Sequence, residues 1–337
     1  MKKYYGVDFE KQRTSLLKSK AAKPLIADVI SKADTALSKT YPILKMSDFL
    51  YIYETGNRNK YEQKYFERRN DCSYISIAYW LTEDEKYVKP LIDLIFIICD
   101  EFSWCLPAHA HIDQRKTVRW VIEEVDLFQA ETGRLLTDIA CAVGDKLPYY
   151  VNERIEYEIR RRILDSFEDK TYRWEPLKMN WAAVCAGGSL VTLLHYGTED
   201  EIKNILPRLY SAIDNYLDGF SDDGCCVEGY NYWNYGFGYF LIFARTIYDY
   251  TNGEVNYFKN EKVKNIAKFA QNIRLTSDKN VSFSDSVSDY SISLGAMCFL
   301  KSLYGDEIIL PELSAPITRG ESRTRERTER MTPICRF

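Results

Sequence analysis

Asn180 and Trp181 open a segment whose residue types could position a ligand. The segment, residues 179–188, reads MNWAAVCAGG and continues into an apolar stretch with helical spacing. The Asn180 amide can donate and accept hydrogen bonds, so it suits the stabilisation of developing negative charge. Gly187 and Gly188 weaken a helix, and glycines in such positions usually mark the close approach of another backbone or a ligand.

A second segment, residues 222–236, carries the carboxyl and phenol groups that acid–base chemistry needs. It reads DDGCCVEGYNYWNYG, an acidic turn that runs into a helix start with three Tyr, two Asn and one Trp within six residues. Tyrosine offers a flat face for stacking on sugars and a hydroxyl for hydrogen bonding. A surface turn whose aromatic rings cover the core would have a similar composition. The candidate site residues in this segment are Glu228, Tyr230, Tyr232, Trp233 and Tyr235.

The elements that must position these segments are predicted to be helices almost throughout. Apolar residues recur at spacings of three and four, which marks one face of a helix, for example at Tyr87, Leu91, Leu94, Ile95, Ile98 and Phe102. Further helices are predicted at residues 9–21, 24–38, 62–80, 115–142, 151–166, 181–196, 199–218, 232–250, 259–275 and 287–304. Strand-like alternation of useful length is missing, so the predicted class is all-α.

The tetrapeptide TEDE occurs twice, at residues 82–85 and 198–201, each time between two apolar helices. Thr at the N-cap with Glu three residues later is typical of a capping box, which starts a helix. Two equivalent junctions fit an array of antiparallel helical hairpins. Such hairpins form a solenoid when they stack openly and a toroid with a concave cleft when they curl round.

Composition and charge argue against several classes of protein. A net charge of −4 gives no whole-chain reason to expect nucleic acid as a partner, although a local basic cleft could still hold an acidic sugar. No apolar run approaches the roughly 20 residues that a membrane span needs. The first residues lack the apolar region of a secretory signal, so a soluble, cytoplasmic protein is expected.

The cysteines and histidines do not predict a disulfide framework or a metal site. The sequence has nine Cys without a CxxC pair and only three His, so no metal ligand set and no cofactor is expected. Five cysteines lie in apolar helical stretches and are expected to pack as small hydrophobic residues: Cys72, Cys99, Cys141, Cys185 and Cys298. Of the other polar residues, Arg160–Arg162 are predicted to lie on a solvated helix face and His195 in the core.

Together, the two segments resemble the toroid of heparinase II/III-like polysaccharide lyases and related alginate lyases. The resemblance is carried by NWxxVCxGG, which begins at Asn180, and by DGxxxEGxxYWNYG, which begins at Asp223. It covers roughly residues 45–305. Supporting fragments are the Arg68–Asn70 region leading to YWLTEDEKY, WCLPAH at 104–109, DLFQAETG at 126–133 and FSDS at 283–286.

The resemblance implies an (α/α) toroid that acts on an acidic polysaccharide or oligosaccharide by β-elimination at a uronic acid. A base removes the C5 proton and an acid protonates the departing O4, once hydrogen bonds have neutralised the carboxylate. Asn180 would bind the carboxylate, Tyr232 would be base, acid or both, and Tyr235 would be the reserve. A tyrosine of ordinary pKa near 10 would need a nearby positive charge or donor for this work. The residues expected to contact the substrate are Trp181, Trp233, Tyr230, Glu228, His109 and His111.

The residue beside Asn180 distinguishes this sequence from many relatives. Where those proteins have His next to the Asn, this sequence has Trp181. The two histidines of the PAHAH segment, His109 and His111, could assist, but a loop with a structural histidine fits that segment equally well.

Three regions are expected along the chain. Residues 1–305 would form the toroid, residues 306–318 a linker or the start of a second domain, and residues 319–337 a disordered tail rich in Arg, Glu and Thr. Lyases of this type normally continue into a β-sandwich that adds catalytic residues, and the sequence ends before one, so weak turnover is expected. The tail could also come from a shifted reading frame.

Three other functions remain open at this point. One is a non-catalytic carbohydrate-binding or scaffold toroid. Another is a glycoside hydrolase on the same fold, which would need two carboxylates facing the scissile bond, with Asp126, Asp222, Asp223 and Glu228 available. The third is a uronate epimerase.

Overall fold

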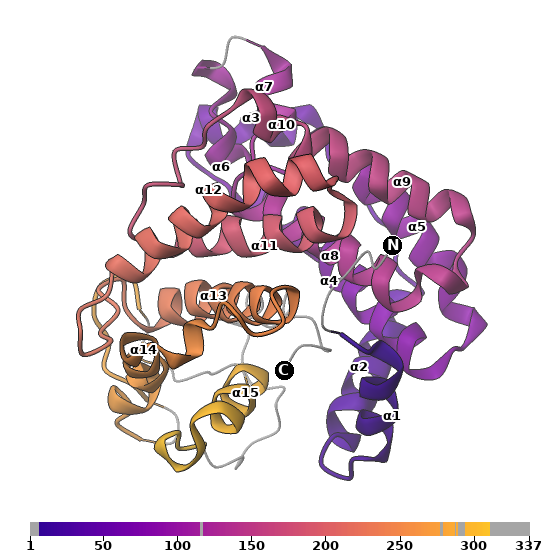
Figure 1. Cartoon of the computed structure of the whole chain (residues 1–337). Coiled ribbons are helices and arrows are strands. Elements are labelled where there is room, and N and C mark those ends of the chain that lie inside the picture. Colours follow the sequence, from indigo (N-terminus) through magenta and orange to yellow (C-terminus); the bar gives the residue numbers. More distant parts are fainter. Residues whose placement is uncertain (1–6, 115–116, 277–278, 287, 289–293, 311–337) are drawn as a thin grey trace. The chain divides into compact units, whose positions relative to one another are not determined.

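The computed structural model describes residues 7–114, 117–276, 279–286, 288 and 294–310, and these residues form an all-α protein (Figure 1). The only β-type pairing within these ranges is an isolated antiparallel bridge between Arg274 and Asn280. The predicted fold class is therefore confirmed as all-α for this part of the chain. The chain gathers into two compact units: residues Asp8–Lys170, which we call the N-terminal unit, and the residues from Thr171 onward with Val7, which we call the C-terminal unit.

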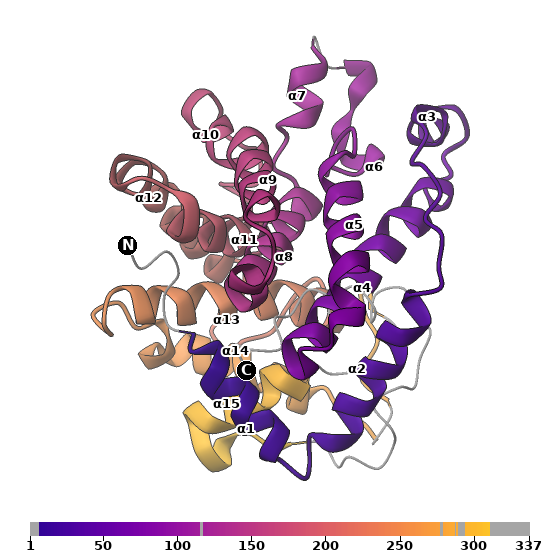
Figure 2. The ribbon, with the colours of Figure 1, turned by 90° about the vertical axis from the view of Figure 1, so that its right-hand side faces the viewer.

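The N-terminal unit is built around the long helix α4. Its helices are α1 (Phe9–Lys18), α2 (Lys23–Ala36), α3 (Met46–Thr55), α4 (Asn59–Thr82), α5 (Val88–Cys99), α6 (Pro107–Ala110), α7 (Val118–Ile122), α8 (Leu127–Val143), α9 (Tyr149–Ile159) and α10 (Ser166–Asp169). Helix α4 packs against α2, α5 and α8, and α5 packs against α9 (Figure 2). Tyr65 of α4 contacts Phe128 and Thr132 of α8, and Arg69, one turn later in α4, contacts Thr132. Later residues of α4 thus contact later residues of α8, so the two helices run parallel.

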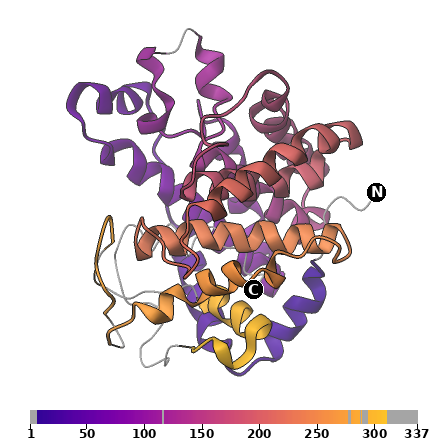
Figure 3. The same ribbon diagram turned by 60° about the vertical axis from the view of Figure 1, so that its left-hand side comes forward.

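The C-terminal unit is built around α11. Its helices are α11 (Asn180–Tyr196), α12 (Glu199–Asp218), α13 (Tyr230–Tyr250), α14 (Glu261–Asn272) and α15 (Leu294–Tyr304). Helix α11 packs against both α12 and α13. Only Gly197 and Thr198 separate α11 from α12, so these two helices form an antiparallel hairpin. Figure 3 shows α13 and α14 in orange and α15 in yellow.

Helices α11 and α13 approach closely because glycines lie at their contacts. A Cβ on Gly187 of α11 would lie 2.7 Å from the carbonyl oxygen of Tyr239, and a Cβ on Gly236 of α13 would lie 3.0 Å from the Cβ of Asn180. The contact moves forward along both helices, from Asn180 and Gly236 to Gly187 and Tyr239, so α11 and α13 run parallel. The expected close approach at Gly187 is confirmed, and its partner is a backbone.

The helix predicted at residues 115–142 is wrong, because the structure divides it. Helix α7 ends at Ile122, and α8 begins only at Leu127. Asp126 starts α8 as its N-cap, since its carboxylate accepts hydrogen bonds from the backbone N–H groups of Phe128 (3.1 Å) and Gln129 (2.8 Å). The apolar spacing continues across the break, which explains why the pattern alone does not reveal it.

The two TEDE segments differ in structure. The second starts α12 with a capping box, in which the Thr198 hydroxyl and the Glu201 carboxylate each accept a backbone N–H of the other residue, as predicted. The first does not form one, because α4 continues through Thr82 and the left-handed Glu83 ends it. Asp84 caps the short 3-10 turn that follows (Glu85–Tyr87) in place of Thr82.

The predicted solvated face at Arg160–Arg162 is wrong for Arg162, which is buried. After α9 the chain makes a π turn at Arg160–Leu164, which changes the phase of the helix and turns Arg162 inwards. Of the five cysteines expected to pack as small hydrophobic residues, Cys72, Cys99 and Cys185 are buried, Cys141 is half-buried and Cys298 is exposed. The eight described cysteines are all free thiols.

Several predictions fall outside the described residues. The tail at 319–337 lies there, as does the predicted 306–318 segment beyond Leu310 and the start of the helix predicted at 287–304. Among the helices that the structure describes, none is both long and apolar enough to cross a membrane.

Candidate functional site

Two hydrogen bonds join the sequence segments that contain Asn180 and Glu228. The backbone N–H of Asn180 donates to Glu228 Oε2 (2.9 Å), and its side-chain Nδ2 donates to Oε1 (2.7 Å). Asn180 is the first residue of α11, where backbone N–H groups have no partner within the helix, and Met179 before it provides no side-chain cap. Glu228 therefore caps α11 from a segment 48 residues away.

Glycines allow the acidic turn to bring Glu228 to this position. Gly224 and Gly229 both have left-handed backbones, with φ of +84° and +86°. A side chain on Gly224 would overlap the backbone of Asn265, and one on Gly229 would overlap the Ser286 hydroxyl. The backbone N–H of Asn231 also donates to that hydroxyl (3.3 Å). The DGxxxEG pattern thus specifies a turn that only glycine permits at two points.

The electrostatic environment of Glu228 is mixed. Burial raises the pKa of its carboxyl above the ordinary value, the two hydrogen bonds from Asn180 lower the pKa, and the nearby charge of Asp285 raises it again. The net direction is upward. Glu228 is thus a half-buried carboxyl that holds its proton more readily than a solvated glutamate.

Tyr216 of α12 also belongs to this site, and the motif analysis missed it. Its hydroxyl lies 3.0 Å from the point that a Cβ on Gly236 would occupy, beside Asn180. Burial, and then the nearby groups of Cys226 and Glu228, raises the pKa of Tyr216 well above its ordinary value. No local pattern could have identified this residue, because it comes from an ordinary amphipathic helix and reaches the site only through the packing of α12.

The aromatic residues of the second segment divide between core and surface. Tyr230 and Trp233 are buried, with their rings stacked on each other, and the Trp233 ring also stacks on Phe237. The Trp233 indole N–H donates to the Ile266 carbonyl (2.9 Å). In this structure both rings are core side chains and not exposed faces for a sugar.

The three remaining aromatic candidates are Trp181, which follows Asn180 in α11, and Tyr232 and Tyr235, which lie on α13. Trp181 is half-buried, and the Arg173 guanidinium lies 5.3 Å from its ring centre. Tyr232 is half-buried and precedes Gly236 by one helical turn, so it shares the face of α13 on which Asn180 packs. Tyr235 is buried, with its ring edge-on to Tyr239.

His109 and His111 belong to the N-terminal unit. His109 Nδ1 lies 2.6 Å from Asp126 Oδ2, and its ring stacks on Phe128. Since Asp126 also caps α8, this histidine is fixed in place by a buried carboxylate that is itself anchored. His111 ends the short helix α6 with a left-handed backbone (φ 48°).

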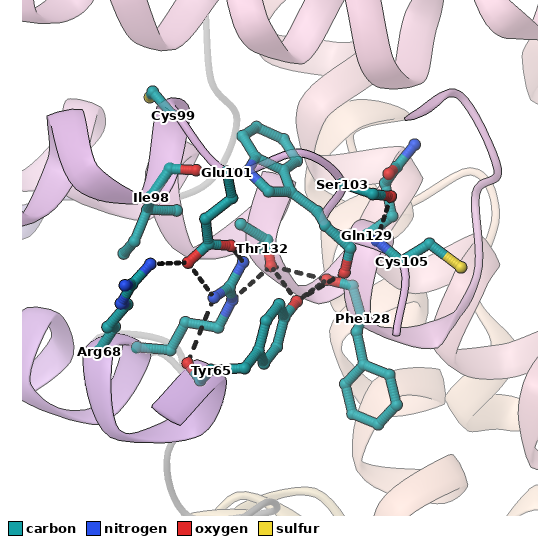
Figure 4. Close-up of polar contacts among 12 residues, drawn as sticks. Tyr65, Arg68, Ile98, Cys99, Glu101, Ser103, Cys105, Phe128, Gln129 and Thr132 are labelled. Atoms are coloured by element: carbon teal, nitrogen blue, oxygen red, sulfur yellow. Dashed lines mark hydrogen bonds and ion pairs between the residues drawn. The ribbon is translucent and has the colours of Figure 1, made fainter. Parts of the chain in front are cut away.

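The N-terminal unit also contains a buried polar cluster, formed by Tyr65, Arg68, Arg69, Glu101, Thr132 and Arg162. Figure 4 labels four of its members, Tyr65, Arg68, Glu101 and Thr132. Glu101 accepts hydrogen bonds from Arg69 Nη2 (2.7 Å) and Arg68 Nη1 (3.1 Å), while Arg69 Nε donates to Thr132 (2.8 Å). The Tyr65 hydroxyl donates to the Trp104 carbonyl (2.7 Å). Arg162 pairs with Glu158 (2.7 Å) and donates to the Glu101 carbonyl (2.7 Å). The cluster ties α4, α8 and the segment after α5 together.

Within the described residues, no group of three or more His, Cys, Asp or Glu side chains is arranged to hold a metal ion. The chain matches no model of a known protein family and no curated protein.

Proposed function

We propose that this chain is the (α/α) toroid part of a polysaccharide lyase of the heparinase II/III type, which acts on a uronic-acid-containing chain by β-elimination. The observation that carries the proposal is the pair of hydrogen bonds from Asn180 to Glu228. Two sequence segments with the residue types for this chemistry meet there, within one compact unit.

The helix directions support a toroid. In an (α/α) toroid, successive hairpins place every second helix in an inner ring, and the inner helices run parallel to one another. In the N-terminal unit, α4 and α8 are parallel, with α5 and the short helices α6 and α7 between them in sequence. In the C-terminal unit, α11 and α13 are parallel, with α12 between them. Each unit by itself has the local pattern that the proposal requires.

In the proposed reaction, Asn180 helps to bind the uronate carboxylate. Its Nδ2 carries two hydrogens, of which Glu228 takes one, so the second can donate to the substrate. Glu228 has a raised pKa, and in its protonated form it can share a hydrogen bond with the same carboxylate and so withdraw charge from it. Both contacts make the C5 proton more acidic. Tyr232, on the adjoining face of α13, is the proton carrier.

Product chemistry tests this proposal. The full chain is incubated with heparan sulfate, hyaluronan and alginate, and a lyase produces a C4–C5 double bond that absorbs in the near ultraviolet. Tyr232→Phe should lower turnover by roughly 10²–10⁴-fold while leaving sugar binding largely unchanged, because the ring remains but the proton carrier is lost. Tyr248→Phe, on the exposed end of the same helix, is the matched control. Equal activity in the two variants would contradict the role of Tyr232.

A glycoside hydrolase is the second candidate, and the raised pKa of Glu228 favours it. A carboxyl that keeps its proton beside a second acidic group, here Asp285, is the arrangement that a general acid needs. The same incubation separates the two functions, because hydrolysis produces new reducing ends without near-ultraviolet absorbance.

A further inference from the structure

Two buried polar atoms of the candidate site have no hydrogen-bond partner in the described part of the protein: Asn180 Oδ1 and the Tyr216 hydroxyl. Both side chains are about as buried as any in the molecule, with 1% and 2% of their surface exposed. Burial of an unpaired hydrogen-bonding atom is costly, so such atoms are uncommon unless something else satisfies them. The hydroxyl is the only polar group of the Tyr216 side chain.

The two atoms belong to neighbouring side chains. The Tyr216 hydroxyl and the Cβ of Asn180 each lie 3.0 Å from the same point beside Gly236 of α13. Asn180 is in turn bonded to Glu228, which is half-buried and so partly in contact with solvent. The two unpaired atoms therefore belong to side chains that meet at one place beside Gly236.

The chemistry of the two atoms restricts what can satisfy both. Asn180 Oδ1 only accepts hydrogen bonds, while the Tyr216 hydroxyl can donate one, because its raised pKa keeps it protonated. A carboxylate has no hydrogen to give Asn180 Oδ1. An ammonium group has no lone pair to accept from Tyr216. A hydroxyl meets both demands, since it donates through its hydrogen and accepts through its oxygen.

We propose that Asn180 Oδ1 and the Tyr216 hydroxyl form a subsite for one neutral hydroxyl group of a sugar, so that Tyr216 helps to determine which sugar binds. This inference rests on the proposed carbohydrate function. In this proposal the two ends of the Asn180 amide bind different groups of one sugar unit. The nitrogen donates to the uronate carboxylate, and the oxygen accepts from a hydroxyl.

The test compares Tyr216→Phe with Tyr210→Phe by calorimetric titration of the full chain. Tyr210 lies on the same helix, where its ring contacts Phe243, and serves as the matched control. The probes are tetrasaccharides of hyaluronan, heparan sulfate and alginate, together with the neutral cellotetraose. Tyr216→Phe should weaken the binding of at least one probe by about tenfold, the loss expected for one hydrogen bond. Its Tm should not fall, because the change removes an unsatisfied buried hydroxyl. Tyr210→Phe should leave affinity unchanged.

Each result decides between the possibilities. If Tyr216→Phe binds every probe as well as the unaltered chain, the two atoms are satisfied by water or not at all, and the subsite is wrong while the lyase proposal stands. If only cellotetraose binds and its binding depends on Tyr216, the subsite stands and action on uronic acids is wrong. If no probe binds the unaltered chain, both proposals are overturned.

Discussion

The buried polar cluster of the N-terminal unit and the Asn180 site of the C-terminal unit use polar residues in opposite ways. In the cluster, Glu101 accepts hydrogen bonds from both Arg68 and Arg69. Arg68 also donates to the Pro42 carbonyl, and Arg69 donates to the Thr132 hydroxyl. Single atoms such as Arg68 Nε lack a partner among the described residues, but the side chains that carry them are held through their other atoms. In the Asn180 site, by contrast, Tyr216 makes no hydrogen bond in the part of the chain that the structure describes.

This difference distinguishes polar residues that hold the fold from those available to a ligand. Charges that consume each other's hydrogen bonds have little capacity left for a substrate, and their removal exposes a buried, uncompensated partner. Polar atoms that remain unsatisfied destabilise the fold, and they keep their hydrogen-bonding capacity for a bound molecule. The contrast is consistent with our proposals, in which the cluster stabilises the fold and the Asn180 site binds a ligand.

The largest expected effect tests the cluster. Glu101→Gln removes the carboxylate that pairs with both Arg68 and Arg69, so we expect a loss of about 3–5 kcal/mol in the free energy of unfolding. Asp100→Asn, at the adjacent position, is the control, because the Asp100 carboxylate is 66% exposed and pairs with Arg154 at the surface. The control should cost about 0–1 kcal/mol. Urea unfolding of the full chain measures both, and equal losses would end the assignment of the cluster to stability.

A smaller effect is expected where the Asn180 site is positioned by backbone contact. Gly187→Ala places a Cβ 2.7 Å from the Tyr239 carbonyl, so α11 and α13 must separate, at a cost of about 1–3 kcal/mol. Gly238→Ala is the control on α13, since its Cβ would meet no atom within 4 Å. It should stabilise the protein by about 0.5–1 kcal/mol, because alanine favours a helix more than glycine. The difference between the two variants in thermal unfolding measures how far the site depends on this contact.

The same residues show how much the sequence could predict. Spacing and composition predict the helices, the capping box at Thr198 and the close approach at Gly187, because each depends on residues within a few turns. The break before Asp126 and the inward turn of Arg162 depend on a single cap and on a π turn, which leave the apolar spacing nearly unchanged.

The candidate site was less predictable, because it depends on contacts between distant segments. The residue types at Asn180, Glu228 and Tyr232 suggested chemistry, but nothing local indicated that Glu228 caps α11 or that Tyr216 reaches Asn180. Tyr230 and Trp233 illustrate the reverse error, since aromatic residues that suit a sugar suit a core equally well. The packing of α14, whose Ile266 carbonyl accepts the Trp233 indole N–H, identifies Trp233 as a core residue.

The smallest effect concerns the ionisation of Glu228, where two physical effects compete. Its place at the start of α11 and its hydrogen bonds from Asn180 favour the charged carboxylate, whereas burial and the charge of Asp285 favour the protonated form. The pKa of Glu228 is raised above the ordinary value of 4.5, so the effect of burial is larger than that of the hydrogen bonds. The folded state then binds more protons than the unfolded chain. The contribution of Glu228 to stability is fully present below pH 4.5 and is lost as the pH rises through the folded-state pKa.

Glu228→Gln isolates this contribution, because glutamine does not titrate. The variant loses one of the two hydrogen bonds from Asn180 at every pH, because its amide nitrogen cannot accept. This loss lowers the free energy of unfolding of the variant by the same amount at every pH, so it does not change the dependence on pH. The informative quantity is the stability of the unaltered chain minus that of the variant, measured by urea unfolding from pH 4 to pH 8. We expect this difference to decrease as the pH rises above 4.5 and then to level off. A difference that increases over the same range would mean that the helix terminus prevails. Glu228 would then be a structural cap with an ionised carboxylate, and the contrast between the two regions would be lost at this residue.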